Sequence, residues 1–168
     1  MKNIVFIGMP GSGKSTVSQL LAQALGRPWF DCDTEIERLS GKSVSAIFSE
    51  HGEEHFRNLE TECLKSLING DGTVIAAGGG AVLRNAKLLG ENSTVVYLQR
   101  SIPDILGSLA EDESRPLLAS QKEESLKALY EERKSLYEAS CDIAVLNDST
   151  IEACVQKVLE GINEVSSN

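Results

Sequence analysis

The segment GMPGSGKST, residues 8–16, constrains the chain most strongly. It fits the pattern G-x-x-x-x-G-K-[ST], and it lies between the apolar run Ile4–Ile7 and a run with helical spacing of apolar residues. Glycines in such a loop let backbone N–H groups surround a polyphosphate, and the following helix adds the positive end of its dipole. Lys14 has the reach for the β- and γ-phosphates, and the Ser15 hydroxyl suits Mg²⁺. We therefore predict a phosphate-binding loop; the alternative is a glycine-rich turn that only caps a helix.

Short β-rich runs alternate with helical patterns along the chain, which predicts an α/β fold with a parallel sheet. The continuously apolar strands indicate that helices cover both faces of the sheet, and ligands of such folds bind at the carboxyl ends of the strands. With 168 residues and no linker, we expect one domain over residues 1–168. The predicted strands are Asn3–Ile7, Pro28–Asp31, Thr73–Ala77, Thr94–Leu98 and Asp142–Val145. The predicted helices are Ser15–Leu25, Thr34–Leu39, Ala81–Leu89 and Glu123–Glu138.

Composition limits the partners that the chain can bind. A net charge of −9 argues against nucleic acid and against anionic membranes. No apolar run approaches the ~20 residues of a membrane helix, and the N-terminus shows no signal peptide. The four cysteines form no CxxC pair, so we expect buried thiols in a reducing, cytoplasmic compartment: Cys32, Cys63, Cys141 and Cys154. No heptad pattern is present, and the default expectation is a monomer.

Two carboxylates follow the second predicted strand. Asp31 and Asp33 lie two residues apart, on one side of an extended chain end. One of them could hold Mg²⁺ through water, and the other could accept a proton from an attacking hydroxyl. The alternative, of equal weight, is that Asp33 only caps the next helix.

Two arginines lie on or beside apolar stripes of predicted helices. Arg133 falls on the stripe of the helix Glu123–Glu138, where an inward guanidinium needs a carboxylate partner or an anionic ligand. Arg57 lies beside a second stripe, and Glu60 is placed to orient it. Such a pair could clamp a carboxylate from two directions, and structural ion pairs are the alternative.

Two further segments have features of a ligand site. Three glycines, Gly78, Gly79 and Gly80, end the third strand, where they allow close approach of a ligand and offer N–H donors; a flexible turn is the alternative. Pro116 keeps Arg115 extended on a loop that is able to move, as an arginine that neutralises charge in phosphoryl transfer requires. An idle surface arginine is the alternative there.

One motif argues for a different chemistry. Residues 51–55, HGEEH, fit the zinc-peptidase pattern H-x-x-E-H. Gly52 weakens the helix that such ligands need, and no third ligand is evident, so we do not expect a zinc site.

Six motifs, in order and spacing, resemble the shikimate kinase family: GMPGSGKST (8–16), FDCDTEIE (30–37), FRNLE (56–60), AAGGG (76–80), RPLL (115–118) and RKSLYE (133–138). The resemblance implies a P-loop kinase fold like that of nucleoside monophosphate kinases. It implies a mobile lid at about residues 109–122 and a substrate-binding helical region around residues 33–60. The implied reaction is ATP + shikimate → ADP + 3-phosphoshikimate, a step toward aromatic amino acids.

The same resemblance implies roles for individual residues. The ATP-binding residues would be Gly11, Ser12, Gly13, Lys14, Ser15, Thr16 and Arg115. The catalytic residues would be Lys14, Asp33 and Arg115. The shikimate-binding residues would be Asp33, Arg57, Gly78, Gly79, Gly80 and Arg133. Mg²⁺ would be held by Ser15 and, through water, by Asp31. The chain departs from the family where Ser108 replaces an arginine that covers adenine, where Ser135 replaces a common proline, and at residues 147–150, which lack a basic residue.

Two other functions remain open at this point. A gluconate-type kinase of the same fold would use the same phosphate loop. A non-catalytic nucleotide-sensing module would bind ATP without an acceptor. A GTPase is not expected, because no guanine-reading Asn-Lys-x-Asp motif is present.

Overall fold

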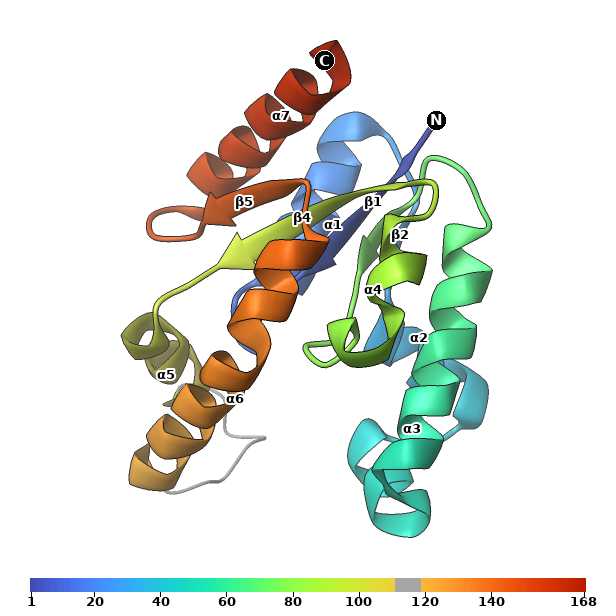
Figure 1. Ribbon diagram of the computed structural model, residues 1–168, viewed down its shortest axis with the longest axis vertical. Coiled ribbons are helices and arrows are strands. Elements are labelled where there is room, and N and C mark those ends of the chain that lie inside the picture. The colour runs from blue at the N-terminus through green and yellow to red at the C-terminus, as the bar shows by residue number, and fades with distance from the viewer. Residues whose placement is uncertain (111–118) are drawn as a thin grey trace.

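The computed structural model describes residues 1–110 and 119–168, and in them five parallel strands form one sheet (Figure 1). The strand order is β2-β3-β1-β4-β5. The α/β prediction is confirmed, and each predicted strand end lies within one residue of the observed one. The strands are β1 (Asn3–Ile7), β2 (Trp29–Asp31), β3 (Val74–Ala76), β4 (Ser93–Gln99) and β5 (Ile143–Leu146).

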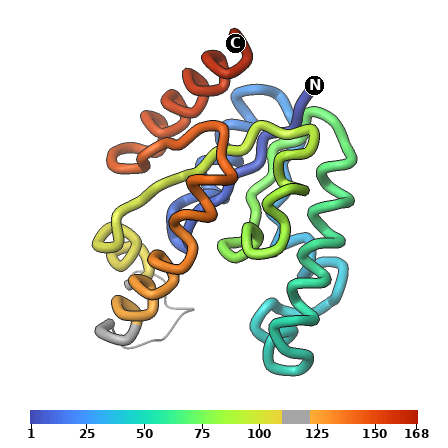
Figure 2. The backbone as a smooth tube through the Cα atoms, viewed as in Figure 1, coloured from blue at the N-terminus to red at the C-terminus, as the bar shows by residue number. Residues whose placement is uncertain are grey.

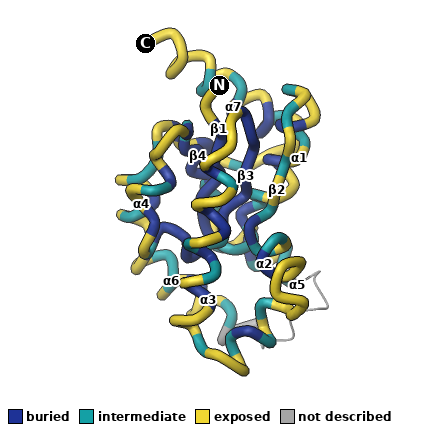
Figure 3. The backbone as a smooth tube through the Cα atoms, turned by 90° about the vertical axis from the view of Figure 1, so that its right-hand side faces the viewer, coloured by how far each residue is buried: buried dark blue, intermediate teal, exposed yellow. Residues whose placement is uncertain are grey.

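Helices cover both faces of the sheet. Helices α1 (Lys14–Leu25) and α7 (Ile151–Ser167) pack on one face. The other face is covered by α2 (Cys32–Ser40), α3 (Val44–Ile68), α4 (Val82–Gly90), α5 (Ile102–Ala110) and α6 (Ala119–Ser140). Strand β1 is apolar on both sides for this reason: Ile4 and Phe6 face the first layer, and Val5 and Ile7 face the second. Buried residues follow the central strands β1, β3 and β4, and the two termini lie at the same end of the molecule (Figures 2 and 3).

Three of the four cysteines have the burial that was predicted, and one does not. Cys32, Cys63 and Cys154 are buried free thiols, as predicted, but Cys141 is only half-buried because it follows the end of α6. Within residues 1–110 and 119–168, no helix has the length and apolar character to cross a bilayer.

The HGEEH segment lies on α3, where Gly52 interrupts the helix with φ 83°. His51 and His55 are exposed, with ring centroids 4.7 Å apart. Among the residues that the structure describes, no three His, Cys, Asp or Glu side chains are grouped so that they could hold a metal ion.

Candidate active site

The phosphate loop connects β1 to α1 and depends on glycine at two points. A Cβ at Gly8, where φ is +148°, would lie 2.5 Å from the Leu98 carbonyl oxygen of β4. A Cβ at Gly13, which caps α1 with φ +96°, would lie 2.8 Å from Asn147 Nδ2. No other residue type fits so close to backbone or adopts these angles without strain. The loop is therefore packed tightly against the carboxyl ends of the neighbouring strands.

Two side chains that we did not predict hold the carbonyls of this loop. Arg100 Nη1 donates to Gly11 O, and Asn147 Nδ2 donates to Ser12 O, each at 2.9 Å. Because C=O and N–H point in opposite directions across a trans peptide, these bonds turn the next N–H groups away from Arg100 and Asn147. Each residue directly follows the carboxyl end of a parallel strand, and this position is the signal that sequence reasoning could have used.

Lys14 lies over the loop. Its ammonium donates to Gly8 O at 2.7 Å and to Met9 O at 2.9 Å. Its positive charge also lowers the pKa of Asp33, against the burial that raises it. Lys14 therefore acts on both the loop and the carboxylate that follows β2.

The two carboxylates after β2 are positioned differently from the prediction. Asp31 caps α2, because its Oδ1 accepts from the Thr34 N–H at 3.1 Å, and its Oδ2 accepts from the Ser15 hydroxyl. The alternative that Asp33 caps this helix is wrong, and so is the expectation that both carboxylates extend from a strand end. Helix α2 begins at Cys32, earlier than predicted, so Asp33 lies in its first turn and its side chain is not used as the cap.

The loop, the two carboxylates and the glycine segment line one cavity of about 410 Å³. Its lining residues are Pro10, Gly11, Gly13, Lys14, Ser15, Thr16, Asp31, Asp33, Ala77, Gly78 and Gly79. The strand order explains this arrangement, because β2, β3 and β1 are neighbours and their carboxyl ends share one edge of the sheet.

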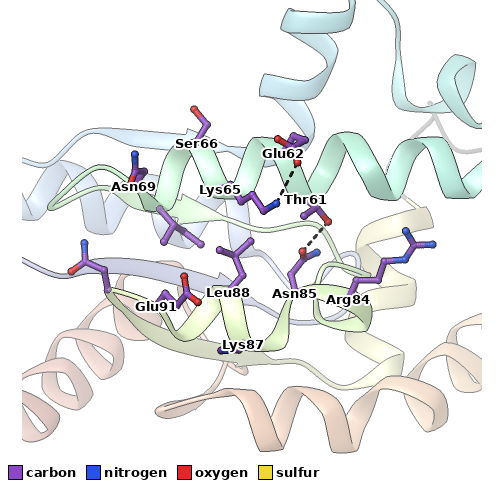
Figure 4. Close-up of a pocket in the computed structure, with 12 residues that line it drawn as sticks. Thr61, Glu62, Lys65, Ser66, Asn69, Arg84, Asn85, Lys87, Leu88 and Glu91 are labelled. Atoms are coloured by element: carbon purple, nitrogen blue, oxygen red, sulfur yellow. Dashed lines mark hydrogen bonds and ion pairs between the residues drawn. The ribbon is translucent and has the colours of Figure 1, made fainter.

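A larger groove of about 840 Å³ lies between α3 and α4, as Figure 4 shows. Its charged side chains have both signs, with Lys65 paired to Glu62 at 3.4 Å. Thr61 Oγ1 donates to Asn85 Oδ1 at 2.8 Å inside the groove. No residue of the phosphate loop lines it. The chemistry of the side chains, and not cavity size, therefore identifies the candidate site.

The glycine segment after β3 is packed against the site on two sides. A Cβ at Gly79 would lie 2.9 Å from Pro10 Cδ in the phosphate loop. A Cβ at Gly80 would lie 2.3 Å from Arg57 Nη2 on α3. The alternative of a loose, flexible turn does not agree with this packing, because each glycine leaves room for a neighbour that belongs to the site.

Gly78 lies next to two carboxylates. A Cβ there would be 2.8 Å from Glu60 Oε2 and 3.1 Å from Asp33 Oδ1. Burial raises the pKa of Asp33, the negative charge of Asp31 raises it further, and Lys14 and Arg57 oppose the shift. The pKa of Asp33 therefore depends on charges from both the phosphate loop and α3.

Arg57 is 7% exposed, and its Nη1 donates to Glu60 Oε1 at 2.9 Å. Glu60 is 0% exposed, so this ion pair is buried and fixes the guanidinium, as predicted for Glu60. Glu53, at 63% side-chain exposure, lies 3.5 Å from Arg57 Nε and forms a weaker contact at the surface.

Arg133 is turned inward on α6, as predicted, with 8% exposure. Within the described residues, no carboxylate lies within ion-pair distance of it. Burial raises the pKa of Glu60, and the charges of both Arg57 and Arg133 lower it. The two arginines therefore approach the same carboxylate from α3 and α6, although only Arg57 is paired with it.

Unpaired buried polar atoms gather at this point. In the part of the chain that the structure describes, five buried side-chain atoms have no hydrogen-bond partner: Ser12 Oγ, Asp33 Oδ1, Arg57 Nε, Glu60 Oε2 and Arg133 Nε. Leaving such a group unsatisfied costs about 1–3 kcal/mol, and more when it is charged. Three of the five belong to side chains that lie against the glycine segment, those of Asp33, Arg57 and Glu60, and this concentration of donors and acceptors indicates a binding site for a polar ligand.

Arg115 and the middle of the predicted lid, residues 111–118, lie outside the described residues. Ser108, on α5, is half-buried.

The family model described as "Shikimate kinase" matches residues 10–163. A shikimate kinase from Clostridium botulinum (strain Alaska E43 / Type E3) is 39% identical over 161 residues, which covers 94% of this chain and 96% of that protein. One from Sulfurihydrogenibium sp. is 42% identical over 139 residues, with 82% and 83% covered.

Solved structures agree with these relatives. Shikimate kinase from Acinetobacter baumannii, in complex with shikimate, has a TM-score of 0.91 and 34% identity, with 98% of this chain and 94% of that chain covered. A gluconokinase from Sinorhizobium meliloti has a TM-score of 0.69 at 18% identity, with 99% and 94% covered. At that identity, the second likeness shows a shared fold alone.

Proposed function

The chain belongs to the shikimate kinase family, and from that premise we propose how its own residues phosphorylate shikimate. The γ-phosphoryl group of ATP passes to the 3-hydroxyl of shikimate, which gives ADP and 3-phosphoshikimate for aromatic amino acid biosynthesis. The observation that supports these residue roles most strongly is the cluster of unpaired buried polar atoms beside the phosphate loop.

The donor binds at the phosphate loop. The N–H groups of residues 11–16 surround the phosphates, and Lys14 neutralises charge on the transferred group. The Ser15 hydroxyl and the Asp31 carboxylate lie in contact and are hard oxygen donors, which fit Mg²⁺. They would hold the ion directly and through water. Bound there, Mg²⁺ supplies positive charge that stabilises the β- and γ-phosphates.

The acceptor binds between α3, α6 and the glycine segment. Arg57 and Arg133 hold the carboxylate of shikimate, and backbone N–H groups of Gly78, Gly79 and Gly80 add donors. Arg133 contributes a charge that forms no ion pair with any carboxylate of the described residues, whereas Arg57 is already fixed by Glu60. Because the positive charge of Arg133 is left for the ligand, the pocket is selective for an acid.

Asp33 orients the 3-hydroxyl and accepts its proton. The hydroxyl oxygen forms a bond to the γ-phosphorus while the bond from that phosphorus to the bridging oxygen breaks, and the electron pair leaves with ADP. A raised pKa brings Asp33 closer to the working pH, which favours proton transfer at that moment. Arg115, by the family resemblance, would add positive charge at the transferred phosphoryl group.

We further propose that the enzyme works as a cytoplasmic monomer. The free thiols fit a reducing compartment. Light scattering of the purified protein, with and without shikimate, tests the monomer.

A panel of acids distinguishes this function from its alternatives. With Mg²⁺ and ATP, we expect a phosphorylated product from shikimate and little from gluconate or other open-chain polyhydroxy acids, as seen by mass spectrometry. Preferred phosphorylation of gluconate would favour a gluconate-type kinase. ATP consumption that is absent, or that does not depend on any acid, would favour a nucleotide-sensing module.

A further inference from the structure

We propose that Tyr137 is a positioning residue for the acceptor, because its hydroxyl fixes the peptide between Gly79 and Gly80. The proposal rests on the proposed function, and it concerns a residue that does not itself touch substrate. Tyr137 lies one turn after Arg133 on α6. Burial raises the pKa of its phenol, and the Arg133 side chain, which interacts with the phenol, lowers that pKa, so the hydroxyl contacts both the glycine segment and the arginine of the acceptor site.

The phenol is held rigidly. Tyr137 is 0% exposed, and its ring stacks on Tyr97 with centroids 5.1 Å apart and planes at 28°. Its hydroxyl donates to Gly79 O at 2.5 Å and lies 4.0 Å from the Met9 sulfur of the phosphate loop. A ring that cannot tilt and a short hydrogen bond together give the Gly79 carbonyl one direction, toward α6.

That direction decides what the glycine segment presents to a ligand. Across a trans peptide the C=O and N–H point in opposite directions, so the Gly80 N–H points away from Tyr137. The Gly80 α-carbon lies against the Arg57 guanidinium, where even a Cβ would be too close. The N–H and the guanidinium thus become donors of one binding surface.

Three consecutive glycines need such a restraint. Glycine loses more conformational freedom on ordering than any other residue, and no side chain in this segment packs to hold it. A hydroxyl on a buried, stacked ring supplies an external anchor. The bond to Gly79 therefore reduces the entropy that shikimate binding would otherwise lose in ordering the segment.

Tyr137→Phe tests this role because it keeps the ring and its stacking. We expect the KM for shikimate to rise about 5-fold to 10-fold, as loss of one net hydrogen bond predicts. The KM for ATP and kcat should stay within about twofold. Tyr97→Phe is the matched control: it removes a hydroxyl from the stacked neighbour, and Gly79 keeps its bond from Tyr137. Its kinetic constants should match those of the unmodified enzyme.

The shift in melting temperature on ligand binding is a second readout, and it can be measured even if Tyr137→Phe is less stable than the unmodified enzyme. Saturating shikimate should raise the melting temperature of Tyr137→Phe less than that of the unmodified enzyme, whereas Mg-ADP should raise both equally. Equal shikimate shifts, an unchanged KM for shikimate, or parallel increases in both KM values would overturn the positioning role. Failure of the unmodified enzyme to phosphorylate shikimate would instead overturn the proposed function, so the two failures are distinct.

Discussion

Arg57 and Arg133 are both buried, but their charges are balanced differently. Arg57 forms a buried ion pair with Glu60, whereas Arg133 has no carboxylate partner among the described residues. A buried charge without a partner destabilises the fold, and a ligand that supplies the partner recovers that free energy on binding. In a chain of net charge −9, these two side chains and Lys14 form the local positive region that two anionic substrates require.

Replacement of Arg133 by alanine should weaken shikimate binding with little loss of stability. The variant removes about 2–4 kcal/mol of charge-assisted bonding, so the KM for shikimate should rise roughly 30-fold to 1,000-fold. The KM for ATP serves as the internal control. Steady-state kinetics that show an unchanged KM for shikimate would exclude the clamp.

Replacement of Arg57 by alanine should affect both binding and stability. It leaves Glu60 buried without its partner, which costs about 3–5 kcal/mol of folding free energy. Urea denaturation measures this loss. The double variant Arg57→Met with Glu60→Gln should recover much of the stability but none of the shikimate affinity, and equal stability of the single variant and the unmodified enzyme would contradict the buried pair.

Asp33 should limit stability at high pH. Burial raises its pKa in the folded state above the ordinary value of 3.8, so the native state binds more protons than the unfolded state and stability falls as pH rises through the folded-state pKa. Asp33→Asn removes this penalty. We expect the variant to melt at a higher temperature than the unmodified enzyme at pH 8, with a difference that shrinks toward acid pH.

The same variant should lose activity. Replacing a general base typically lowers kcat about 100-fold to 10,000-fold, so the gain in stability and the loss in turnover have opposite signs. A lower melting temperature at pH 8, measured by circular dichroism, would contradict the origin assigned to the pKa shift.

At the level of elements, the turn after β3 couples the sheet to α3. Gly80→Ala should push the Arg57 guanidinium aside, because the new Cβ would lie 2.3 Å from Nη2. The KM for shikimate should rise at least about 10-fold, the cost of about 1.4 kcal/mol of lost binding. Gly90→Ala is the matched control at the end of α4, where a Cβ meets nothing within 4 Å. If both variants show the same kinetic constants, the close packing at Gly80 has no functional role.

The elements that the sequence predicted best were those whose burial follows from local pattern. Continuous apolar runs located all five strands of the sheet. The start of α2 was misplaced because the cap is Asp31, the last residue of a strand, and Asp31 and Asp33, two residues apart, are equally suitable caps by type. Helices α5 and α7 were not predicted, and of α3 only an apolar stripe beside Arg57 was predicted, without bounds.

The site was predicted to the extent that each residue's type limits its chemistry. The inward Arg133 followed from its place on an apolar stripe, and Glu60 followed from its spacing to Arg57. Arg100 and Asn147 were missed because their partners are backbone carbonyls far along the chain, and only the strand order brings these groups together.

At the level of the whole molecule, the sheet brings together residues that are far apart in sequence. Lys14, Asp33, Arg57, Gly79 and Arg133 come from five separate segments, and the carboxyl edge of the sheet places them around one region. Neither the phosphate loop nor the arginines alone would distinguish a kinase for a cyclic acid from any other nucleotide-binding protein. Their adjacency supports the assignment.

A crystal structure of the protein with shikimate and Mg-ADP tests this adjacency most directly. The account predicts the carboxylate of shikimate between the guanidinium groups of Arg57 and Arg133, with its 3-hydroxyl within hydrogen-bond distance of Asp33 and facing the phosphate loop. Shikimate bound elsewhere, or bound with its carboxylate away from both arginines, would contradict the account.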